Sequence, residues 1–216
     1  ANVTYNNSSA AGQFTTSIAG LVNSETGTVT NQILGVTDAQ YSSNCATGGT
    51  CKVGDLAPGG GYVFYVSDKV INKVDGVSDG GIYLATAPIN WKSGVTGDPT
   101  SSWGCQTSVP GTVSTLGSGA ANTKLVVSAL SNCTTDTVTA RVAMDLSIVD
   151  SGTTYSDWFL PSESEIAYMY TNVRTVAALN KVAYWTSQAA YGLAGSNNNY
   201  NAVAYGFTSG AQFIGC

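Results

Sequence analysis

The stretch VGDLAPGGGYVFYV at residues 53–66 decides the fold, because a cluster of turn residues runs directly into a strand-forming segment. Gly54–Gly61 predicts a turn, and Tyr62–Ser67 predicts a strong β-strand. After the glycine-rich loop Asp75–Gly81, a second strand is expected at Ile82–Ala87. The two strands therefore predict a hairpin with a long, adjustable tip.

Helical signals lie in the second half of the chain. Apolar residues from Leu125 to Leu130 keep helical spacing, so a helix is expected to begin near residues 119–122. Another helix is expected from Thr135 to about Leu146. The SESE run at residues 162–165 fits a capping box, in which the serine and the final glutamate each bond the other's backbone. The helix that it begins should run through Tyr170.

The chain closes with three expected strands, at Val182–Ser187, Ala202–Phe207 and Gln212–Ile214, with a polar loop at residues 196–201. Between the hairpin and the first helix lies a long loop without periodicity. Loops of this length inside a compact domain are usually functional or held by cross-links. The sequence thus predicts an α+β domain over residues 53–216.

Residues 1–52 have a different texture, rich in Thr, Ser, Asn and Gly. Short β-prone pieces occur at Asn2–Tyr5, Gln13–Ile18 and Thr28–Leu34. We expect an N-terminal arm or linker with short strands, able to pair with another strand. A chain that starts at Ala1 would also fit a secreted protein whose signal peptide has been cut off.

Charge and hydropathy exclude two classes of partner. Only 10% of the 216 residues are charged, against about 25% in an average protein, and the net charge is -5. Eight Lys and Arg cannot form the basic stripe that nucleic acid requires, so no nucleic acid is expected. No run of eighteen apolar residues occurs, so no membrane span is expected either. A polar surface poor in charge favours an extracellular protein.

Five cysteines bear on the compartment. Cys45 and Cys51 frame a glycine-rich loop, Cys105 and Cys133 flank the start of the helical region, and Cys216 is left over. No CxxC pair is present, so a metal ribbon is excluded. Two disulfides formed outside the cell are expected, and free thiols in a reducing compartment are the alternative.

The chain contains no histidine, which removes Ser-His-Asp and Cys-His catalysis and every His-ligated zinc or iron site. Carboxylates do cluster at Asp157, Glu163 and Glu165, but a helix N-terminus would attract the two glutamates in any case. No SxxK sequence and no phosphate-binding P-loop occur. We therefore expect a protein that is not an enzyme.

Other residues are candidates for ligand binding. Asp75 and Asp79, around a glycine turn, could hold calcium, and Asp157 could bind calcium or cap a loop; plain turn and cap roles are the alternatives. Trp91 and Trp103 in the long loop could stack on sugar rings, or pack beneath the loop. No cofactor is expected beyond calcium.

From Val53 onward the chain resembles the C-terminal domain of the Legionella collagen-like adhesin and its bacterial extracellular relatives. The resemblance rests on the opening stretch and on YLATAPINW at 83–91, WGC at 103–105, GSGAANT at 117–123, DWFLPSESEIAYMY at 157–170, YWTSQ at 184–188 and AVAYGFTSGAQ at 202–212. It implies a C-type-lectin-like fold, with a hairpin-based sheet, two or three helices and long loops. Relatives are mostly adhesins and display domains.

Some members of this wider fold vary residues on late strands and loops. The matching residues here are Asn197, Asn198, Asn199, Tyr200 and Asn201, which otherwise form an ordinary polar loop. The sequence departs from the family in lacking the calcium-site tripeptides of sugar-binding lectins. It also stops at Cys216, where relatives continue into a closing strand, so an unpaired sheet edge is expected.

Two functions follow as hypotheses. The first is an adhesion or binding module on a bacterial surface, which recognises a glycan or protein through residues around 91–105 and 192–201. The second is a self-assembling subunit of an extracellular fibre or pilus, in which residues 1–20 complete the sheet of a neighbouring copy.

Overall fold

The computed structural model describes two compact units, residues Ala1–Ser42 and Ser43–Cys216. The residues whose structure is described are 13–17 and 28–32, as backbone, with 45, 50–72, 80–105, 107–133, 138–179, 183–190 and 201–215. In the first unit, β1 (Gln13–Ser17) pairs with β2 (Thr28–Gln32) as an antiparallel hairpin, with Gln13 opposite Gln32. Two of the three β-prone pieces are thus strands, and Asn2–Tyr5 lies outside the described residues.

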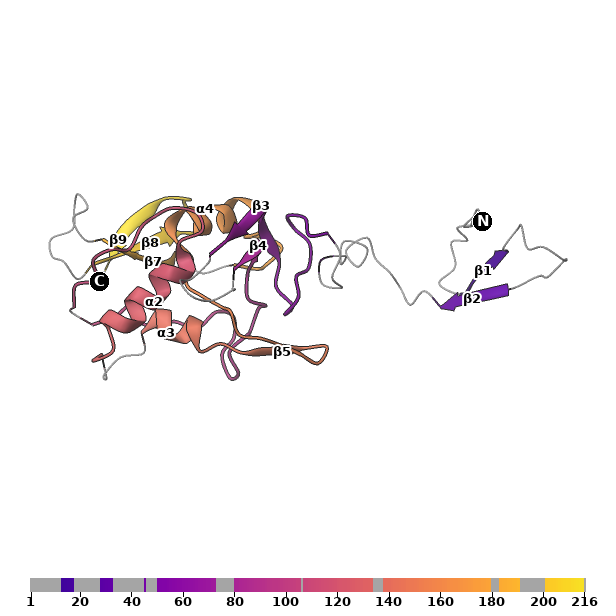
Figure 1. The fold of residues 1–216 in the computed structure, drawn as a ribbon, viewed down its shortest axis with the longest axis horizontal. Coiled ribbons are helices and arrows are strands. Elements are labelled where there is room, and N and C mark those ends of the chain that lie inside the picture. The colour runs from indigo at the N-terminus through magenta and orange to yellow at the C-terminus, as the bar shows by residue number, and fades with distance from the viewer. Residues whose placement is uncertain are drawn as a thin grey trace. The chain divides into compact units, whose positions relative to one another are not determined.

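The second unit begins with the hairpin that the opening stretch predicts (Figure 1). β3 (Val63–Ile71) pairs antiparallel with β4 (Gly81–Ala85). In the turn before β3, the backbone of Gly61 lies close to the backbone of Thr86, because a Cβ on Gly61 would overlap the carbonyl group of Thr86. Glycine is the one residue that lets the two backbones meet there.

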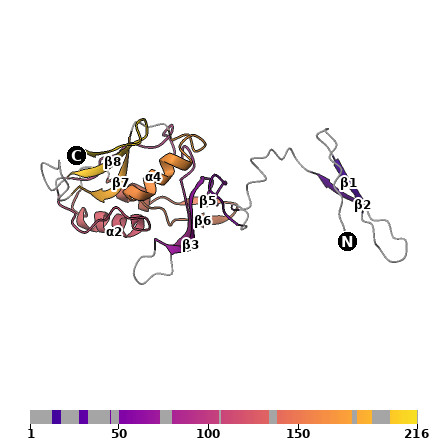
Figure 2. The ribbon, with the colours of Figure 1, turned by 90° about the horizontal axis from the view of Figure 1, so that it is seen from above.

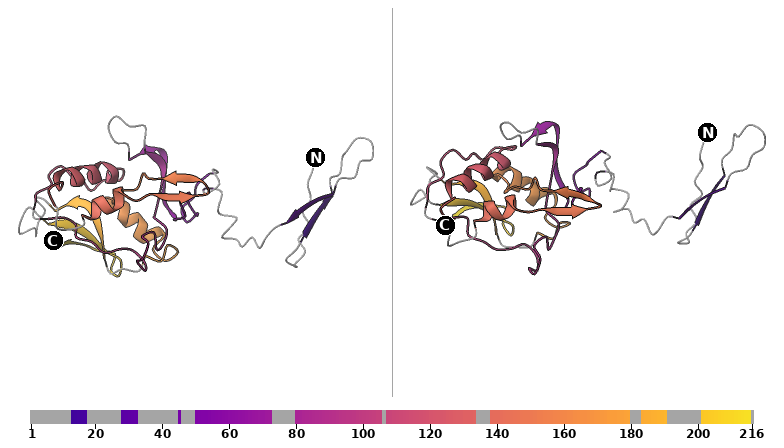
Figure 3. Two further views of the ribbon diagram at one scale, coloured as in Figure 1. Left: turned by 90° about the horizontal axis from the view of Figure 1, so that it is seen from below. Right: turned by 60° about the horizontal axis from the view of Figure 1, so that its bottom comes forward.

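A second hairpin was not expected from the sequence. β5 (Ile148–Asp150) pairs with β6 (Thr153–Tyr155), and the two residues between them have φ angles of 50° and 82°. Two consecutive positive φ values make a primed turn, whose twist matches that of the strands it joins. Figure 3 shows this hairpin projecting from the body of the second unit.

The largest sheet closes the chain, in the order β7 (Ala183–Ala189), β8 (Ala202–Gly206) and β9 (Gln212–Gly215). All three strands were predicted. The central strand presents Ala202 to a core that includes Val126 of the helix α2 (Gly119–Ala129). Tyr205, on the opposite face of β8, lies against Tyr170 of α4 (Glu163–Asn172). Helices α2 and α4 thus cover the two faces of the sheet (Figure 2).

The start of α4 is the capping box that the SESE run predicts. The backbone N–H of Glu165 donates to Ser162 Oγ over 3.4 Å, and the N–H of Ser162 donates to Glu165 Oε2 over 2.8 Å. The remaining helix, α3 (Thr139–Met144), is shorter than predicted in its described part, and residues 134–137 are outside it.

Two disulfides are present, as expected, and their pairing, which the sequence leaves open, is Cys45–Cys51 and Cys105–Cys133. The first joins a small core with Ala57 and Val63, and the second joins the main core beside Leu130. The architecture is α+β, with small antiparallel sheets and a few helices. No helix in the described part of the chain has the length and hydropathy needed to cross a bilayer.

Candidate functional site

The long loop after β4 is fixed in place, although it has no regular structure. Its residue Ser102 forms a parallel bridge to Val138, and the backbone N–H of Thr139 donates to the Ser102 carbonyl over 2.9 Å. On the other side, the indole Nε1 of Trp185 donates to the Ser101 carbonyl over 3.1 Å. The Cys105–Cys133 disulfide ties the loop to the end of α2. The loop is therefore held in place by hydrogen bonds on two sides and by a disulfide.

Trp103 holds the loop from beneath. It is 3% exposed, belongs to the main core, and its Nε1 donates a 2.8 Å hydrogen bond to the Thr186 carbonyl. Of the two sequence alternatives for this residue, the structure places it in packing beneath the loop. A buried ring whose polar atom is satisfied has no free face for a ligand.

Trp91 lies differently, half-buried at the edge of a pocket. Its Nε1 donates to Asp98 Oδ1 over 3.3 Å, and the hydroxyl of Tyr184 donates to Asp98 Oδ2 over 2.7 Å. One carboxylate thus joins a loop aromatic residue to an aromatic residue of β7. Asp98 is not among the residues predicted above, because no local pattern marks an aspartate whose tyrosine partner lies 86 residues away.

Another side of the pocket is formed by the segment between β6 and α4. Trp158 Nε1 donates to the Tyr155 carbonyl over 3.1 Å, and the N–H of Leu160 donates to Thr123 Oγ1 of α2 over 3.0 Å. Gly59 makes room for this segment, because a Cβ there would lie 3.2 Å from the Trp158 ring and 3.5 Å from Tyr155. These contacts fix the position of Trp158, and its ring also lines the pocket.

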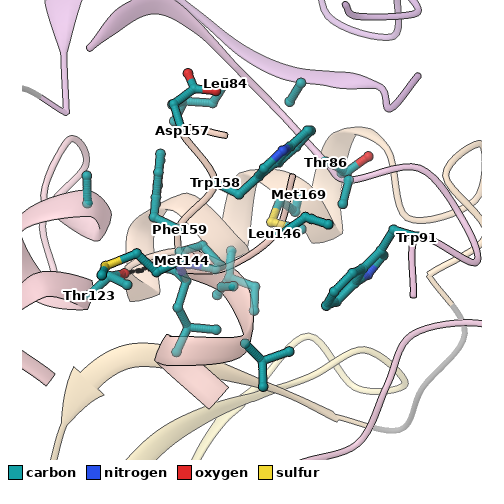
Figure 4. A pocket seen from close by; sticks show the side chains of 18 of the residues that line it. Leu84, Thr86, Trp91, Thr123, Met144, Leu146, Asp157, Trp158, Phe159 and Met169 are labelled. Carbon is teal, nitrogen blue, oxygen red and sulfur yellow. Dashed lines mark hydrogen bonds between the residues drawn. The ribbon is translucent and has the colours of Figure 1, made fainter. Parts of the chain in front are cut away.

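These walls enclose a pocket of about 820 Å³. In Figure 4 the indoles of Trp91 and Trp158 stand on neighbouring sides of it, with Leu146 and Met169 between them. Aromatic side chains lining the pocket come from β3, β4, the long loop, β6, the segment before α4, and β7: Phe64, Tyr83, Trp91, Tyr155, Trp158, Phe159, Tyr184 and Trp185. A volume of this size accommodates a ligand of several hundred daltons, since small-molecule sites typically span about 300–1,000 Å³.

Tyr83 and Asp157 are electrostatic neighbours at this pocket. Burial raises the pKa of the Tyr83 hydroxyl above its ordinary value of 10.0, and the negative charge of Asp157 and the neighbouring Tyr155 raise it further. Asp157 itself is exposed, and it forms no hydrogen bond or ion pair with other described residues. Its carboxylate is therefore free to meet a ligand.

The described part of the structure does not bring the expected calcium ligands together. Asp75 and Asp79 lie outside the described residues. Over the described ranges, no group of three carboxylate or thiol side chains is close enough to hold a metal ion. Asp157 lines the pocket, and its role as a calcium ligand stays a prediction.

Of the expected late-loop residues, Asn197, Asn198, Asn199 and Tyr200 lie outside the described residues, so their role stays a prediction. Asn201 is described and half-buried, and its carbonyl accepts a 2.7 Å bond from the Ala190 N–H. This bond extends the pairing of β7 with β8 by one residue beyond the Ala189–Ala202 pair. Asn201 has a backbone role there.

No protein-family model, curated protein or solved structure matches the chain.

Proposed function

We propose that the chain is an extracellular, non-catalytic binding domain, and that its ligand occupies the pocket between Trp91 and Trp158. The observation that carries this proposal is the concentration of aromatic rings and carboxylates around one rigidly framed cavity. Aromatic faces stack on sugar rings and other planar or apolar groups, while carboxylates accept hydrogen bonds from hydroxyl or amine groups. A glycan or a protein side chain on a target surface fits that chemistry.

Several features support an extracellular setting. Disulfides form and persist mainly outside the cytosol, and the second unit has two. The surface is poor in charge, with 13 acidic and 8 basic residues in the whole chain. Display on a bacterial surface and a C-type-lectin-like fold rest on the resemblance to the Legionella collagen-like adhesin family, and are part of the proposal.

The absence of histidine supports a binding role over a catalytic one. Acid–base chemistry would then fall to the pocket carboxylates. Asp98 already accepts two hydrogen bonds from aromatic side chains, which hold its carboxylate as a fixed acceptor in the lining. The pocket is suited to hold a ligand rather than to transfer a proton to it.

The test is a glycan array, followed by calorimetry of the best ligand with matched variants. Trp91→Ala should abolish or strongly weaken binding, because it removes a wall of the pocket, and should leave the melting temperature almost unchanged. Phe213→Ala, which removes an aromatic ring that is 45% exposed on β9 and outside the pocket, should bind normally. If Trp91→Ala binds as well as the wild type, the pocket is not the ligand site.

A second function, assembly into a fibre, has one observation in its favour. The strand β9 pairs with β8 on one side and, among the described residues, with no strand on the other, and it exposes Phe213. An open edge of this kind accepts an added strand. The expected donor, residues 1–20, contains β1, which here pairs with β2 of its own chain.

Electron microscopy distinguishes the two functions. Under the fibre hypothesis, the full chain forms filaments at high concentration, and a chain lacking residues 1–20 stays monomeric. Filaments formed by the truncated chain would rule out the arm as the donor strand. Monomers from both chains would leave the binding domain as the function.

A further inference from the structure

We infer that the pocket selects a ligand bearing a positively charged ammonium group. This inference rests on the proposed function, and it specifies the chemical class of the ligand. Its basis is the pairing of carboxylates with aromatic faces inside one cavity. A cation over an aromatic ring is attracted by the negative face of the ring, and quaternary ammonium groups are recognised by cages of such rings.

The first carboxylate is Asp98. Its two oxygens accept hydrogen bonds from Trp91 Nε1 and Tyr184, so both aromatic side chains are held beside the carboxylate. Both donors are neutral, and no ion pair to Asp98 occurs among the described residues. Among the described residues, no positive charge therefore compensates the carboxylate of Asp98. Asp98 is half-buried, and burying a charge without a counter-ion costs free energy.

The second carboxylate is Asp157, which is exposed at the pocket and has no hydrogen-bond partner in the described part of the chain. Aromatic side chains share this part of the lining. Tyr83 is near enough for its pKa to be affected by the charge of Asp157, and Tyr155 and Trp158 both pack over Gly59. On this side, the pocket thus combines the Asp157 carboxylate with the aromatic side chains of Tyr83, Tyr155 and Trp158.

The charges of the residues that line the pocket also favour a cationic ligand. Within the described lining, Asp98 and Asp157 are acidic, and Lys124 of α2 is the one basic side chain. Lys124 is exposed and pairs with neither carboxylate. An anionic ligand would meet two negative charges, and a neutral sugar would leave both of them without a counter-ion. An ammonium group brings the positive charge that this lining lacks.

The test compares choline with its neutral carbon isostere, 3,3-dimethylbutan-1-ol, by NMR titration of the full chain. The two molecules have the same shape and differ in charge. We expect choline to bind with a Kd at least about tenfold lower, the size of a favourable cation–π contact. Equal affinities, or no binding of choline at the tryptophan signals, would overturn the inference.

Two variants locate the charge that is responsible. Asp157→Asn removes a negative charge without removing any hydrogen bond in the described structure, and should weaken choline binding while leaving the isostere unaffected. Asp98→Asn should do the same, since the amide oxygen still accepts one bond. Asp68→Asn, an exposed change on β3 outside the pocket, controls for net charge and should alter neither affinity. Unchanged choline affinity in both pocket variants would contradict the inference.

Further ligands identify the source of the ammonium group. Glucosamine against N-acetylglucosamine tests a charged amino sugar, and an Nα-acetyl-lysine amide tests a protein side chain. Failure of the inference is distinguishable from failure of the proposed function. If a neutral glycan binds and Trp91→Ala abolishes that binding, the pocket is the site and only its charge preference is wrong. If Trp91→Ala binds every ligand normally, the pocket itself is wrong.

Discussion

The side-chain amide of Asn72 donates a 2.8 Å hydrogen bond to Oε1 of Glu165, which is fully buried. The same oxygen accepts the Gly117 N–H over 2.9 Å, and the other carboxylate oxygen accepts the Ser162 N–H over 2.8 Å. One glutamate therefore joins the end of β3, the turn before α2 and the start of α4. Residues in or next to these three segments line the pocket, so the hydrogen bonds of Glu165 hold the pocket-lining segments in fixed positions relative to one another.

The first prediction concerns Glu165. Glu165→Ala leaves the side-chain amide of Asn72 and the backbone N–H groups of Gly117, Gly119 and Ser162 without this acceptor, and should lower the free energy of unfolding by about 3–5 kcal/mol. Glu165→Gln keeps one acceptor oxygen and should cost less, about 1–2 kcal/mol. Glu163→Gln, the same chemical change in the same helical turn but on a partly exposed side chain, should cost about 0.5 kcal/mol. Urea denaturation measures all three, and equal losses for Glu163 and Glu165 variants would contradict the cluster.

The second prediction concerns the backbone of Asn72, which has a φ of 56°. Asn72→Ala loses the bonds to Glu165 and to the Ala120 N–H, and also forces a Cβ-bearing residue without a local polar group into the left-handed region. Asn72→Gly loses the same bonds but adopts that φ freely. The alanine variant should therefore be the less stable by about 1 kcal/mol. Thermal unfolding tests this order, and a more stable alanine variant would refute it.

The third prediction compares the two disulfides. Closing a longer loop restricts the unfolded chain more. Replacing Cys105 and Cys133 by serine, which opens a separation of 28 residues, should cost about 3.6 kcal/mol in unfolding free energy. The same change at Cys45 and Cys51, with a separation of 6, should cost about 2 kcal/mol. The first variant should also weaken ligand binding, because its disulfide holds the long loop, and binding by the second should be nearly unchanged.

The fourth prediction separates the roles of two loop tryptophans. Trp103→Phe removes the bond to Thr186 and part of the core, so it should lower the unfolding free energy by about 2 kcal/mol. Trp91→Phe keeps a ring at the pocket and should be nearly neutral for stability. Chemical denaturation together with ligand titration distinguishes them. A stability loss at Trp91 equal to that at Trp103 would show that both pack as core.

The fifth prediction is a pH dependence set by Tyr83. Its folded-state pKa is raised above 10.0, first by burial and then by Asp157, whereas the unfolded chain titrates near the ordinary value. The folded protein thus keeps this proton to higher pH, and the stability from Tyr83 is full below pH 10.0 and is lost as pH rises through the folded pKa. Tyrosinate absorbance should show one late transition that is absent in Tyr83→Phe. In Asp157→Asn it should move to lower pH, and an unchanged transition would place Asp157 away from Tyr83.

Much of the second unit could be predicted from local signals. The capping box of α4, the β3–β4 hairpin and the three closing strands each have a signature within a few residues, because caps, turns and alternation are short-range effects. The β5–β6 hairpin had such a signature too, in the Ser151–Gly152 pair, but its strands are three residues long. Strands that short give too little alternation to stand out.

The pocket was harder to foresee. Trp91 could be selected as an aromatic residue in a long loop, but the same reasoning selected Trp103, and only tertiary packing separates a lining ring from a core ring. Asp98 and Tyr83 acquire their roles from partners far away in the chain, through Tyr184 and Asp157. Periodicity in the sequence predicts helices and strands. A site built from several elements depends on how those elements pack, which periodicity does not show.

The central claim, that the pocket between Trp91 and Trp158 is the ligand site, is tested most directly by the indole N–H signals of the four tryptophans in a ¹H–¹⁵N NMR titration. The titrants are choline, glucosamine and neutral monosaccharides. We expect the Trp91 and Trp158 signals to move with added ligand while that of Trp103, buried in the core, stays in place. Ligand binding that leaves the Trp91 and Trp158 signals unmoved, or moves no indole signal at all, would contradict the claim.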